Sequence, residues 1–447
     1  TYTTDPEGSI AIIDVSGGIA NVTASNVTLL NFNAYDSQIN TLRTAGIRIF
    51  GPSATVSQDM EPEYVTISED NTTAYVVCQE NNALVIVDLT TNTISSIAPL
   101  GYKDHSLARN GFDTDRNSDN IHIASGPFRG YYMPDAIATY KVAGTNYVVS
   151  ANEGDSRDYN GYSEEARFDD LTLDPTMFPN AEELFEAYGD IKVTLAQGDI
   201  DNDGDYDAVY TYGARSFSIW NGTTGALVYD SGDDFEQIVS NDPYYVGLFN
   251  SNEDDADNKN RSDDKGPEPE AVTLGKFGNT TYAFIGMERT GGVMVYDITN
   301  PAAPAFVTFD IPKDTISGAG DQAPEGLVFI DSTDSPTGLP LLVAANEVSK
   351  TLSIWEIADN TVSLFENKKA VSKLSVYPNP ASEQVFVSAE GELIEQVQIY
   401  DMNGRLVREY RSTKAVQIID VQDLDAQVYL IKIQTENGIS TSKLSVK

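Results

Sequence analysis

The chain contains almost none of the residues that build disulfides and common transition-metal sites. Its 447 residues include one cysteine, Cys78, and two histidines, His105 and His122. A disulfide within the chain is therefore excluded, and a zinc site of ordinary composition is nearly excluded. Cys78 lies in the apolar run AYVVCQE, where we expect it to be a small buried hydrophobic residue. No apolar run approaches the length of a membrane-spanning helix.

Positive charge is also scarce. The sequence has 28 Lys and Arg residues against 68 Asp and Glu residues, which gives a formal net charge of −40. Residues 372–447 carry a net charge of only −2, so nearly all of the excess lies in residues 1–371. A surface this negative repels nucleic acid and anionic lipid, and it favours cations or ligands bridged by cations.

A fourfold repeat organises the sequence from about residue 61 to residue 365. Each unit begins with a Pro next to an acidic residue, passes through an apolar run and a turn, and closes a second apolar run with Glu. An antiparallel hairpin places the start of its first strand beside the end of its second. The predicted pairs of neighbouring carboxylates are Glu63 and Glu80, Asp135 and Glu153, Glu270 and Glu288, and Glu325 and Glu347.

Repeated units of several strands are typical of a β-propeller, in which each unit is one blade around a central channel. The inner strands of all blades begin at one mouth of the channel, so the repeat predicts a ring of up to eight carboxylates there. Acids at strand ends can also simply solvate a rim or bond to backbone amides, and this structural alternative stays open. Carboxylates that converge on one axis repel one another unless cations or hydrogen-bond donors neutralise them.

The propeller is predicted over residues 1–366, with a long insertion at about 155–212. Residues 1–30 match the end of a repeat unit without its first two strands, so we expect the propeller to be incomplete at its N-terminus. Within the insertion, Asn180 is the predicted N-cap of a helix over AEELFEAYG. Residues 250–267 are highly charged and lack apolar periodicity, which predicts a mobile loop unless an ion orders it.

The sharpest local motif, GDIDNDGDYD, lies in this insertion. Its aspartates are Asp199, Asp201, Asp203, Asp205 and Asp207. Alternate carboxylates face one point while Gly204 allows the sharp turn, and so many hard oxygen ligands favour Ca²⁺, with Asp205 contributing its backbone carbonyl. Tyr210 occupies the position where an EF-hand carries its closing Glu, so a helix–loop–helix site is disfavoured. An acidic surface turn without an ion is the alternative.

Few cations accompany these carboxylates. The residues that could bind an anionic group are His105, Arg157, Arg215 and Arg289. An arginine next to a carboxylate more often forms a structural ion pair, and a lone histidine more often bonds within a loop. No Gly-x-Ser-x-Gly elbow accompanies the histidines, so a serine-hydrolase triad is disfavoured and no catalytic residue is assigned.

The pattern changes near residue 366. Residues 367–373 (NKKAVSK) are a basic linker, and residues 374–447 contain five or six short alternating runs with Asn-Gly turns. This pattern predicts a small Ig-like β-sandwich. The expected fold class is therefore all-β, with a propeller followed by a sandwich.

The C-terminal segment resembles a known export domain. Residues 374–447 are similar to the type A C-terminal sorting domain of the type IX secretion system of Bacteroidetes. The matching motifs are YPNPASEQVFV, IYDMNGRLV and VYLIKIQTENGISTSKLSVK. The resemblance implies transport across the outer membrane, with the secretion machinery as a partner. It also implies a final location outside the cell or on the outer-membrane surface.

The N-terminal segment resembles the choice-of-anchor I family, extracellular proteins related to mesenchyme-specific cell-surface glycoproteins. The motifs that carry this resemblance over residues 1–366 include LRTAGIRIFGP, QDMEPEYVTISEDNTTAYVVCQENNALVIVDL, SANEGDSRDY, GDYDAVYTYGARSFSIW and RSDDKGPEPEAVTLG. Some members of the family are labelled alkaline-phosphatase-like, so the resemblance brings a phosphoesterase into consideration.

The sequence leaves two functions open. The first is a secreted, calcium-binding propeller that acts as a binding or adhesion module for an anionic, glycan or mineral ligand. The second is a metal-dependent phosphoesterase, similar to calcium-requiring propeller phosphatases and phytases. In such enzymes, cations held by clustered carboxylates bind the phosphate and lower the pKa of the attacking water. The lack of an evident catalytic base favours the binding module.

Overall fold

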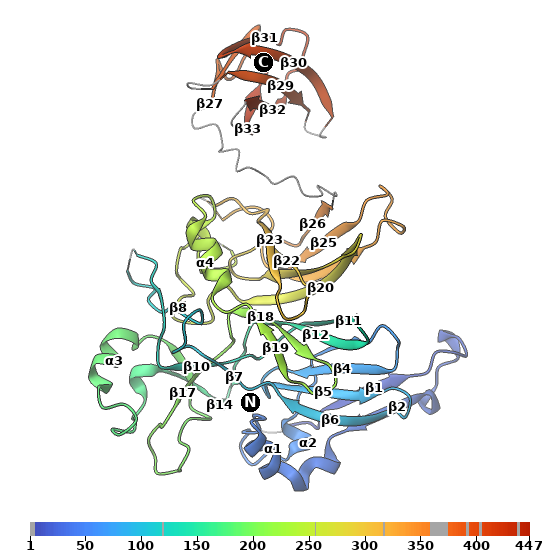
Figure 1. Ribbon diagram of the computed structural model, residues 1–447, viewed down its shortest axis with the longest axis vertical. Helices are drawn as coiled ribbons and strands as arrows, with labels where there is room; N and C mark the ends of the chain where they lie inside the picture. Colours follow the sequence, from blue (N-terminus) through green and yellow to red (C-terminus); the bar gives the residue numbers. More distant parts are fainter. Residues whose placement is uncertain are drawn as a thin grey trace. The chain divides into compact units, whose positions relative to one another are not determined.

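The computed structural model describes residues 5–118, 120–254, 256–315, 318–357, 374–389, 393–401, 405–435 and 439–447. The chain divides into two compact units, Thr1–Ala358 and Asp359–Lys447 (Figure 1). The basic linker predicted at 367–373 lies outside the described residues. Antiparallel sheets dominate both units, so the all-β prediction is confirmed.

The first unit is a β-propeller whose four blades follow the sequence repeat (Figure 1). The first blade contains β3 (Tyr64–Ile67), β4 (Thr73–Cys78), β5 (Ala83–Asp88) and β6 (Thr93–Pro99). The second contains β11 (Ile137–Val142), β12 (Thr145–Asn152), β18 (Ser216–Asn221) and β19 (Leu227–Asp230). The third contains β20 (Pro269–Phe277), β21 (Thr280–Met287), β22 (Val293–Asp297) and β23 (Ala305–Asp310). The fourth contains β24 (Pro324–Ile330), β25 (Leu341–Asn346) and β26 (Thr351–Glu356).

The first strands of successive blades lie next to one another. β11 contacts both β3 and β20, and β20 contacts β24. Apolar clusters fill the spaces between blades, with Trp220 between the first and second and Tyr296 between the second and third. This order brings the starts of all four first strands to the same region of the unit.

A two-stranded sheet precedes the blades. β1 (Ser9–Ile13) pairs with β2 (Val27–Asn31), and Ile10, Ile12 and Leu30 pack against the core of the first blade. Two short helices, α1 (Ile39–Ala45) and α2 (Val56–Asp59), lead from this sheet to β3. The half unit expected in residues 1–30 is therefore a separate pair of strands on the first blade.

The connection before β11 and the insertion in the second blade fold together. β7 (Tyr102–Asp104), β10 (Phe128–Tyr131) and β17 (Val209–Thr211) form a three-stranded sheet in the order β17-β10-β7. Three two-stranded sheets accompany it, formed by β8 (Phe112–Asp113) with β9 (Ile123–Ala124), β13 (Asp158–Tyr159) with β14 (Tyr162–Ser163), and β15 (Glu165–Arg167) with β16 (Lys192–Thr194). The expected helix is α3 (Ala181–Tyr188), although the side chain of Asn180 makes no capping hydrogen bond. A further helix, α4 (Asp234–Asn241), follows β19.

Left-handed backbone marks the start of three blades. The residues before Pro134, Pro269 and Pro324 are Met133, Glu268 and Ala323, and they adopt φ angles of 43°, 50° and 61°. Their carbonyls accept the backbone N–H groups of Gly154, Glu288 and Glu347 at 3.0, 2.8 and 2.8 Å. Each of these hairpins therefore closes on a residue in the left-handed conformation. This conformation costs a non-glycine residue about 1–2 kcal/mol of free energy. Part of the Pro–acid repeat is thus a structural device that closes each hairpin through a backbone carbonyl.

β-Bulges follow these residues in the third and fourth blades. The register shifts at the start of β20 and at the start of β24, and Glu270 and Glu325 lie within the two bulges. The bulge in β20 leaves the backbone of Glu288 bonded to Glu268 rather than to Glu270. The bulge shifts the register, because it adds a residue to one strand only, and Glu288 still lies close enough to Glu270 to raise its pKa.

The second unit is a small β-sandwich, as predicted. One sheet contains β27 (Leu374–Tyr377), β28 (Gln384–Ala389) and β31 (Val416–Asp420). The other contains β29 (Ile394–Tyr400), β30 (Leu406–Lys414), β32 (Val428–Thr435) and β33 (Ile439–Ser445). The core between them includes Val385, Val397 and Ile431, all fully buried.

Candidate functional site

The acidic residues at the starts of the inner strands gather in one region. The carboxylates of Asp135 and Glu270 lie close enough to Glu325 for electrostatic repulsion. Glu63 is repelled in the same way by Asp135 and by Glu80.

The acids that close the second strands join this group. The charge of Glu153 raises the pKa of Glu63, Asp135 and Glu270. The charge of Glu288 likewise raises the pKa of Glu270. The structure therefore brings seven of the eight proposed ring carboxylates within electrostatic reach of one another. The eighth is Glu347, whose backbone N–H donates to the carbonyl of Ala323 at the start of the fourth blade.

Burial and mutual repulsion make these groups weak acids. Burial first, and the neighbouring carboxylates second, raise the pKa to about 8 for Glu63, about 7 for Asp135, about 10 for Glu270 and about 8 for Glu288. Oε2 of Glu270 is buried and has no hydrogen-bond partner among the described residues. Without a cation, these carboxyl groups therefore hold protons near neutral pH.

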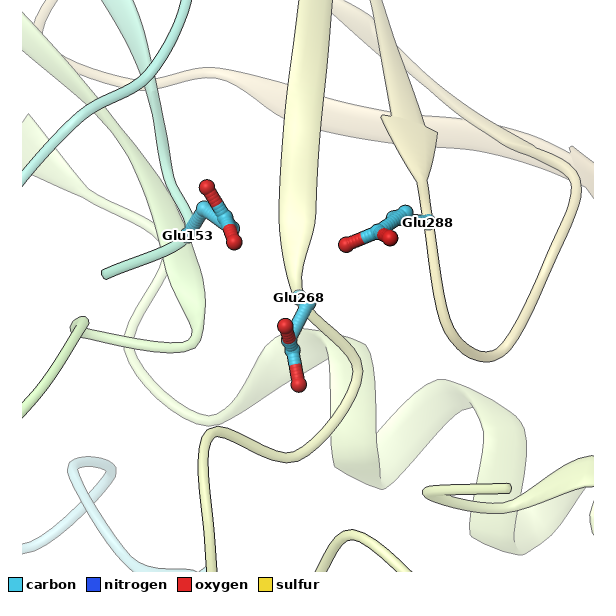
Figure 2. A group of neighbouring side chains, drawn as sticks. All are labelled: Glu153, Glu268 and Glu288. Carbon is cyan, nitrogen blue, oxygen red and sulfur yellow. The ribbon is translucent and has the colours of Figure 1, made fainter. Parts of the chain in front are cut away.

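Glu153, Glu268 and Glu288 form one close group of carboxylates. One carboxylate oxygen from each lies within 4.8 Å of the others. Figure 2 shows Glu153 and Glu288 on either side of the strand start that carries Glu268; the three residues come from the ends of β12 and β21 and the start of β20. Two of the three belong to the predicted ring, and Glu268 takes the place that the bulge denies to Glu270.

Basic side chains neutralise part of this group. Lys265 Nζ lies 2.7 Å from Glu153 Oε1 and 2.9 Å from Glu268 Oε2. Arg261 and Arg289 contact Glu268 as well, at 2.6 and 3.2 Å. Burial alone would raise the pKa of Glu268, but these three cations hold it at about 2. Glu268 is therefore a charged anchor for the cations, while Glu270 has no such partner.

The segment 250–267 supplies two of these cations. It was expected to be a mobile loop, yet Lys259 and Asp263 are buried and Lys259 contacts Asp113 at 3.3 Å. Two of its partners, Asp113 and Glu153, lie more than 100 residues away in the sequence, so the local pattern does not predict these contacts. A pocket of about 350 Å³ opens beside it, lined in part by Asp155, Tyr159, Lys192, Arg261 and Lys265. Two of the lining residues, Arg261 and Lys265, are the cations that contact Glu268.

The aspartate loop of the insertion forms two overlapping groups. Carboxylate oxygens of Asp199, Asp201 and Asp207 lie within 4.8 Å of one another, and so do those of Asp174, Asp205 and Asp207. Asp207 belongs to both groups. Asp174 lies outside the sequence motif, which is why motif spacing could not identify it.

Asp203 was predicted as a ligand, but it belongs to neither of these two groups of described residues. One of its carboxylate oxygens accepts the backbone N–H of Asp205 at 3.2 Å. The backbone N–H groups of Asp203 and Gly204 donate to the Asp199 carboxylate, each at 3.1 Å. Local hydrogen bonds thus preorganise the loop.

The four candidate anion-binding residues are engaged within the protein. Arg157 donates to Asp59 at 2.7 Å, Arg215 donates to Glu236 at 2.7 Å, and Arg289 pairs with Glu253, Glu268 and Glu288. His105 is buried with Nδ1 2.5 Å from the carbonyl of Asn110, and burial lowers its pKa to about 3. These side chains bind acceptors within the protein, which is a more common role for such residues than the binding of an external anion. These contacts favour the structural alternative, and anion binding by these four residues stays a prediction.

The fold is an acidic β-propeller followed by a C-terminal β-sandwich, and the propeller brings buried carboxylates together where its blades begin. The chain belongs to the choice-of-anchor I family, because the model of the choice-of-anchor I domain matches residues 1–301. The model of the secretion system C-terminal sorting domain matches residues 375–447. This domain directs the protein to the cell surface or the extracellular space and implies interaction with the secretion machinery. Among the described residues, no helix is long and apolar enough to cross a bilayer.

Two curated proteins show sequence similarity. Gigasin-3a of Magallana gigas is 31% identical over 212 residues, which cover 43% of this chain and 72% of Gigasin-3a. The ulvan lyase NLR42 of Nonlabens ulvanivorans is 27% identical over 96 residues, which cover 21% of this chain and 18% of the lyase.

Solved structures with related arrangements differ widely in sequence. PorZ, a surface component of the type IX secretion system of Porphyromonas gingivalis, is 10% identical with a TM-score of 0.25, and the match covers 99% of this chain and 56% of PorZ. The Dos1 propeller is 10% identical with a TM-score of 0.28, and the match covers 87% of this chain and 69% of the Dos1 chain.

Proposed function

We propose that the channel mouth of this propeller binds calcium and, through the ion, an anionic or polyhydroxyl ligand outside the cell. The protein would then act as a binding or adhesion module. The observation that carries the proposal is Glu270, a largely buried carboxyl group with an unpartnered oxygen among other acids. Such a group is costly unless it is protonated or bound by a cation. Calcium takes six to eight oxygen ligands, and this region is rich in carboxylate oxygens.

The ion would be held on the side of the mouth that lacks basic partners. Lys265, Arg261 and Arg289 already neutralise Glu268. Glu63, Asp135 and Glu270 instead meet other carboxylates, apart from a weaker attraction of Asp135 to Lys265. These three acids, with Glu288 between the two sides, are the proposed ligands.

A second calcium ion is proposed for the loop Asp199–Asp207. Its support is the pair of aspartate groups that share Asp207 and the hydrogen bonds that fix the loop. We expect this ion to be structural. Chelation of the intact protein should lower its melting temperature, and Asp207→Asn should reproduce that loss without chelator. A melting temperature that neither treatment changes would contradict the loop site.

The phosphoesterase alternative has less support. The cations near the mouth already neutralise carboxylates, and His105 is buried with a pKa of about 3, so a phosphate would depend on calcium alone. Turnover of a model phosphate monoester with and without added Ca²⁺ tests this alternative directly. Calcium-dependent turnover that Glu270→Gln abolishes would establish it in place of the binding module.

Calorimetric titration of metal-stripped protein with Ca²⁺ tests the mouth site. Binding should release protons, because the free acids have raised pKa values, and the measured enthalpy should then depend on the ionisation enthalpy of the buffer. Glu270→Gln should remove one class of site and leave the loop site intact. Glu347→Gln is the matched control, since Glu347 occupies the same place in the repeat as Glu288. Unchanged binding and proton release in Glu270→Gln would refute the mouth site.

A further inference from the structure

Two arginines of the first unit differ from the others in their partners. Residues 1–358 contain ten arginines. Eight of them form ion pairs with Asp or Glu, in keeping with the large excess of acids. Arg43 and Arg129 are the two for which the described residues provide no carboxylate within 4.0 Å. In so acidic a chain, unpaired guanidinium groups are available for an external anion.

Arg43 lies at the edge of a pocket of about 310 Å³. The lining includes Arg43, Arg48, Phe50, Tyr131 and Gln197, and none of the lining residues is acidic. Arg43 is exposed and donates its Nε to the carbonyl of Ile49 at 2.7 Å, which fixes the guanidinium and leaves both terminal nitrogens. Arg48 is buried and already paired with Glu164, so it contributes shape rather than free charge.

Arg129 continues the same surface on the sheet β17-β10-β7. In β10, Arg129 and Tyr131 are two residues apart and share a face; Arg129 pairs with Tyr210 of β17, and Tyr131 pairs with Tyr102 of β7. The ring of Tyr131 stacks on that of Tyr210 with centroids 4.7 Å apart. The guanidinium of Arg129 lies over Tyr102 and Tyr210, 4.9 and 5.6 Å from the ring centroids.

Tyr131 connects the two features, because it lines the pocket and belongs to the tyrosine face. Tyr102 is 43% exposed, so one ring of this face is available for contact. The surface thus joins a cavity edged by Arg43, which has no carboxylate partner among the described residues, to an exposed aromatic ring and to Arg129. The guanidinium of Arg129 donates to the hydroxyl of Tyr210 at 2.9 Å and lies near Asp104. Sugars carry an apolar ring face and polar edges, and they match a surface that offers both.

We propose that this surface binds an acidic sugar ring, with its carboxylate or sulfate group held by Arg43 and its ring against the tyrosine face. Arginine suits both anions, because its planar group donates two parallel hydrogen bonds. A single-stranded nucleic acid also combines stacking with charge, but a chain of net charge −40 repels a polymer that carries a phosphate on every unit. A bare inorganic oxyanion would not use the tyrosine face.

Ligand-observed NMR with the full chain tests the proposal. The probes are D-glucuronate and D-glucose 6-sulfate, with D-glucose, inorganic sulfate and a short oligothymidylate for comparison. We expect saturation transfer to the two acidic sugars and a dissociation constant that rises at least tenfold in Arg43→Gln. Tyr102→Ala should weaken the acidic sugars several-fold and leave inorganic sulfate unaffected.

Arg109→Gln is the matched control for loss of positive charge. The Arg109 side chain is 75% exposed and pairs with Asp234 in the same unit, so its replacement should change binding less than twofold. Circular dichroism of each variant reports whether the fold is kept; Arg43 and Tyr102 are exposed, so we expect it to be kept. No binding of either acidic sugar would overturn the proposal, as would equal binding by wild type and Arg43→Gln. Tighter binding of oligothymidylate, or binding of inorganic sulfate alone, would overturn the assigned ligand class.

Discussion

At the scale of single residues, neighbours decide which glutamates at the mouth are charged. Glu268 and Glu270 are two residues apart, yet the pKa is about 2 for Glu268 and about 10 for Glu270. Both are removed from water, which disfavours the charged form. Glu268 meets three basic side chains, whereas Glu270 meets four carboxylates. The charged neighbours of each carboxylate therefore determine its chemistry.

The raised pKa of Glu270 predicts how stability depends on pH. Between its unfolded pKa of about 4.5 and its folded pKa of about 10, the folded protein binds one more proton at Glu270 than the unfolded chain. The free energy of unfolding of the calcium-free protein should therefore fall as pH rises through this range, by at most about 1.4 kcal/mol per pH unit for one group.

Replacement of Glu270 by Gln should remove most of this slope. At pH 8 we expect the variant to be more stable than the calcium-free wild type by about 1–3 kcal/mol, because an amide can stay buried without a charge. Urea unfolding at several pH values, with chelator present, measures the effect. Glu347→Gln should keep the wild-type slope, and an unchanged slope in Glu270→Gln would show that another group is responsible.

At the scale of elements, the hairpins were predictable but their exact ends were not. Proline, turn residues and apolar runs are local signals, and they identified the blades and the convergence of the acids. The bulges in β20 and β24 depend on a left-handed residue and a hydrogen bond between strands, which the residue pattern does not specify. For that reason Glu268 was missed in the group that it forms with Glu153 and Glu288.

The left-handed residue at the start of β24 predicts an unusual response to glycine. Ala323 is fully buried with φ of 61°, a conformation that glycine adopts without strain. We expect Ala323→Gly to raise the free energy of unfolding by about 0.5–1 kcal/mol, since the relief exceeds the added entropy of the unfolded chain. Thermal and urea unfolding would measure it.

The same substitution in a helix gives the control. Ala187 lies in α3 and is exposed, so Ala187→Gly should lower the free energy of unfolding by about 1 kcal/mol. A loss of stability in both variants would contradict the prediction that the left-handed conformation of Ala323 is strained.

At the scale of the whole molecule, the change of composition near residue 366 was the most informative sequence signal. It anticipated the separation of the structure into Thr1–Ala358 and Asp359–Lys447. The ion pairs that fix segment 250–267 were not anticipated, because partners such as Glu153 and Lys265 are 112 residues apart. Long-range pairing of this kind leaves no local pattern.

Each unit has its own core, so we expect the two to unfold independently. Calorimetry of the full chain should resolve two unfolding transitions. Calcium should raise the melting temperature of the propeller transition only. Separately expressed residues 374–447 should reproduce the other transition, and trypsin should cut first within 367–373. A single transition that shifts as a whole with calcium would contradict this prediction.

The proton-holding mouth has a consequence for electrophoresis. The formal charge of −40 counts every carboxylate as ionised, whereas the raised pKa values of Glu63, Asp135, Glu270 and Glu288 keep part of this group protonated at pH 7 when no metal is bound. A calcium ion that displaced two or more of those protons would add no net positive charge. The loaded protein would then migrate toward the anode at least as fast as the free protein, although it had bound a cation.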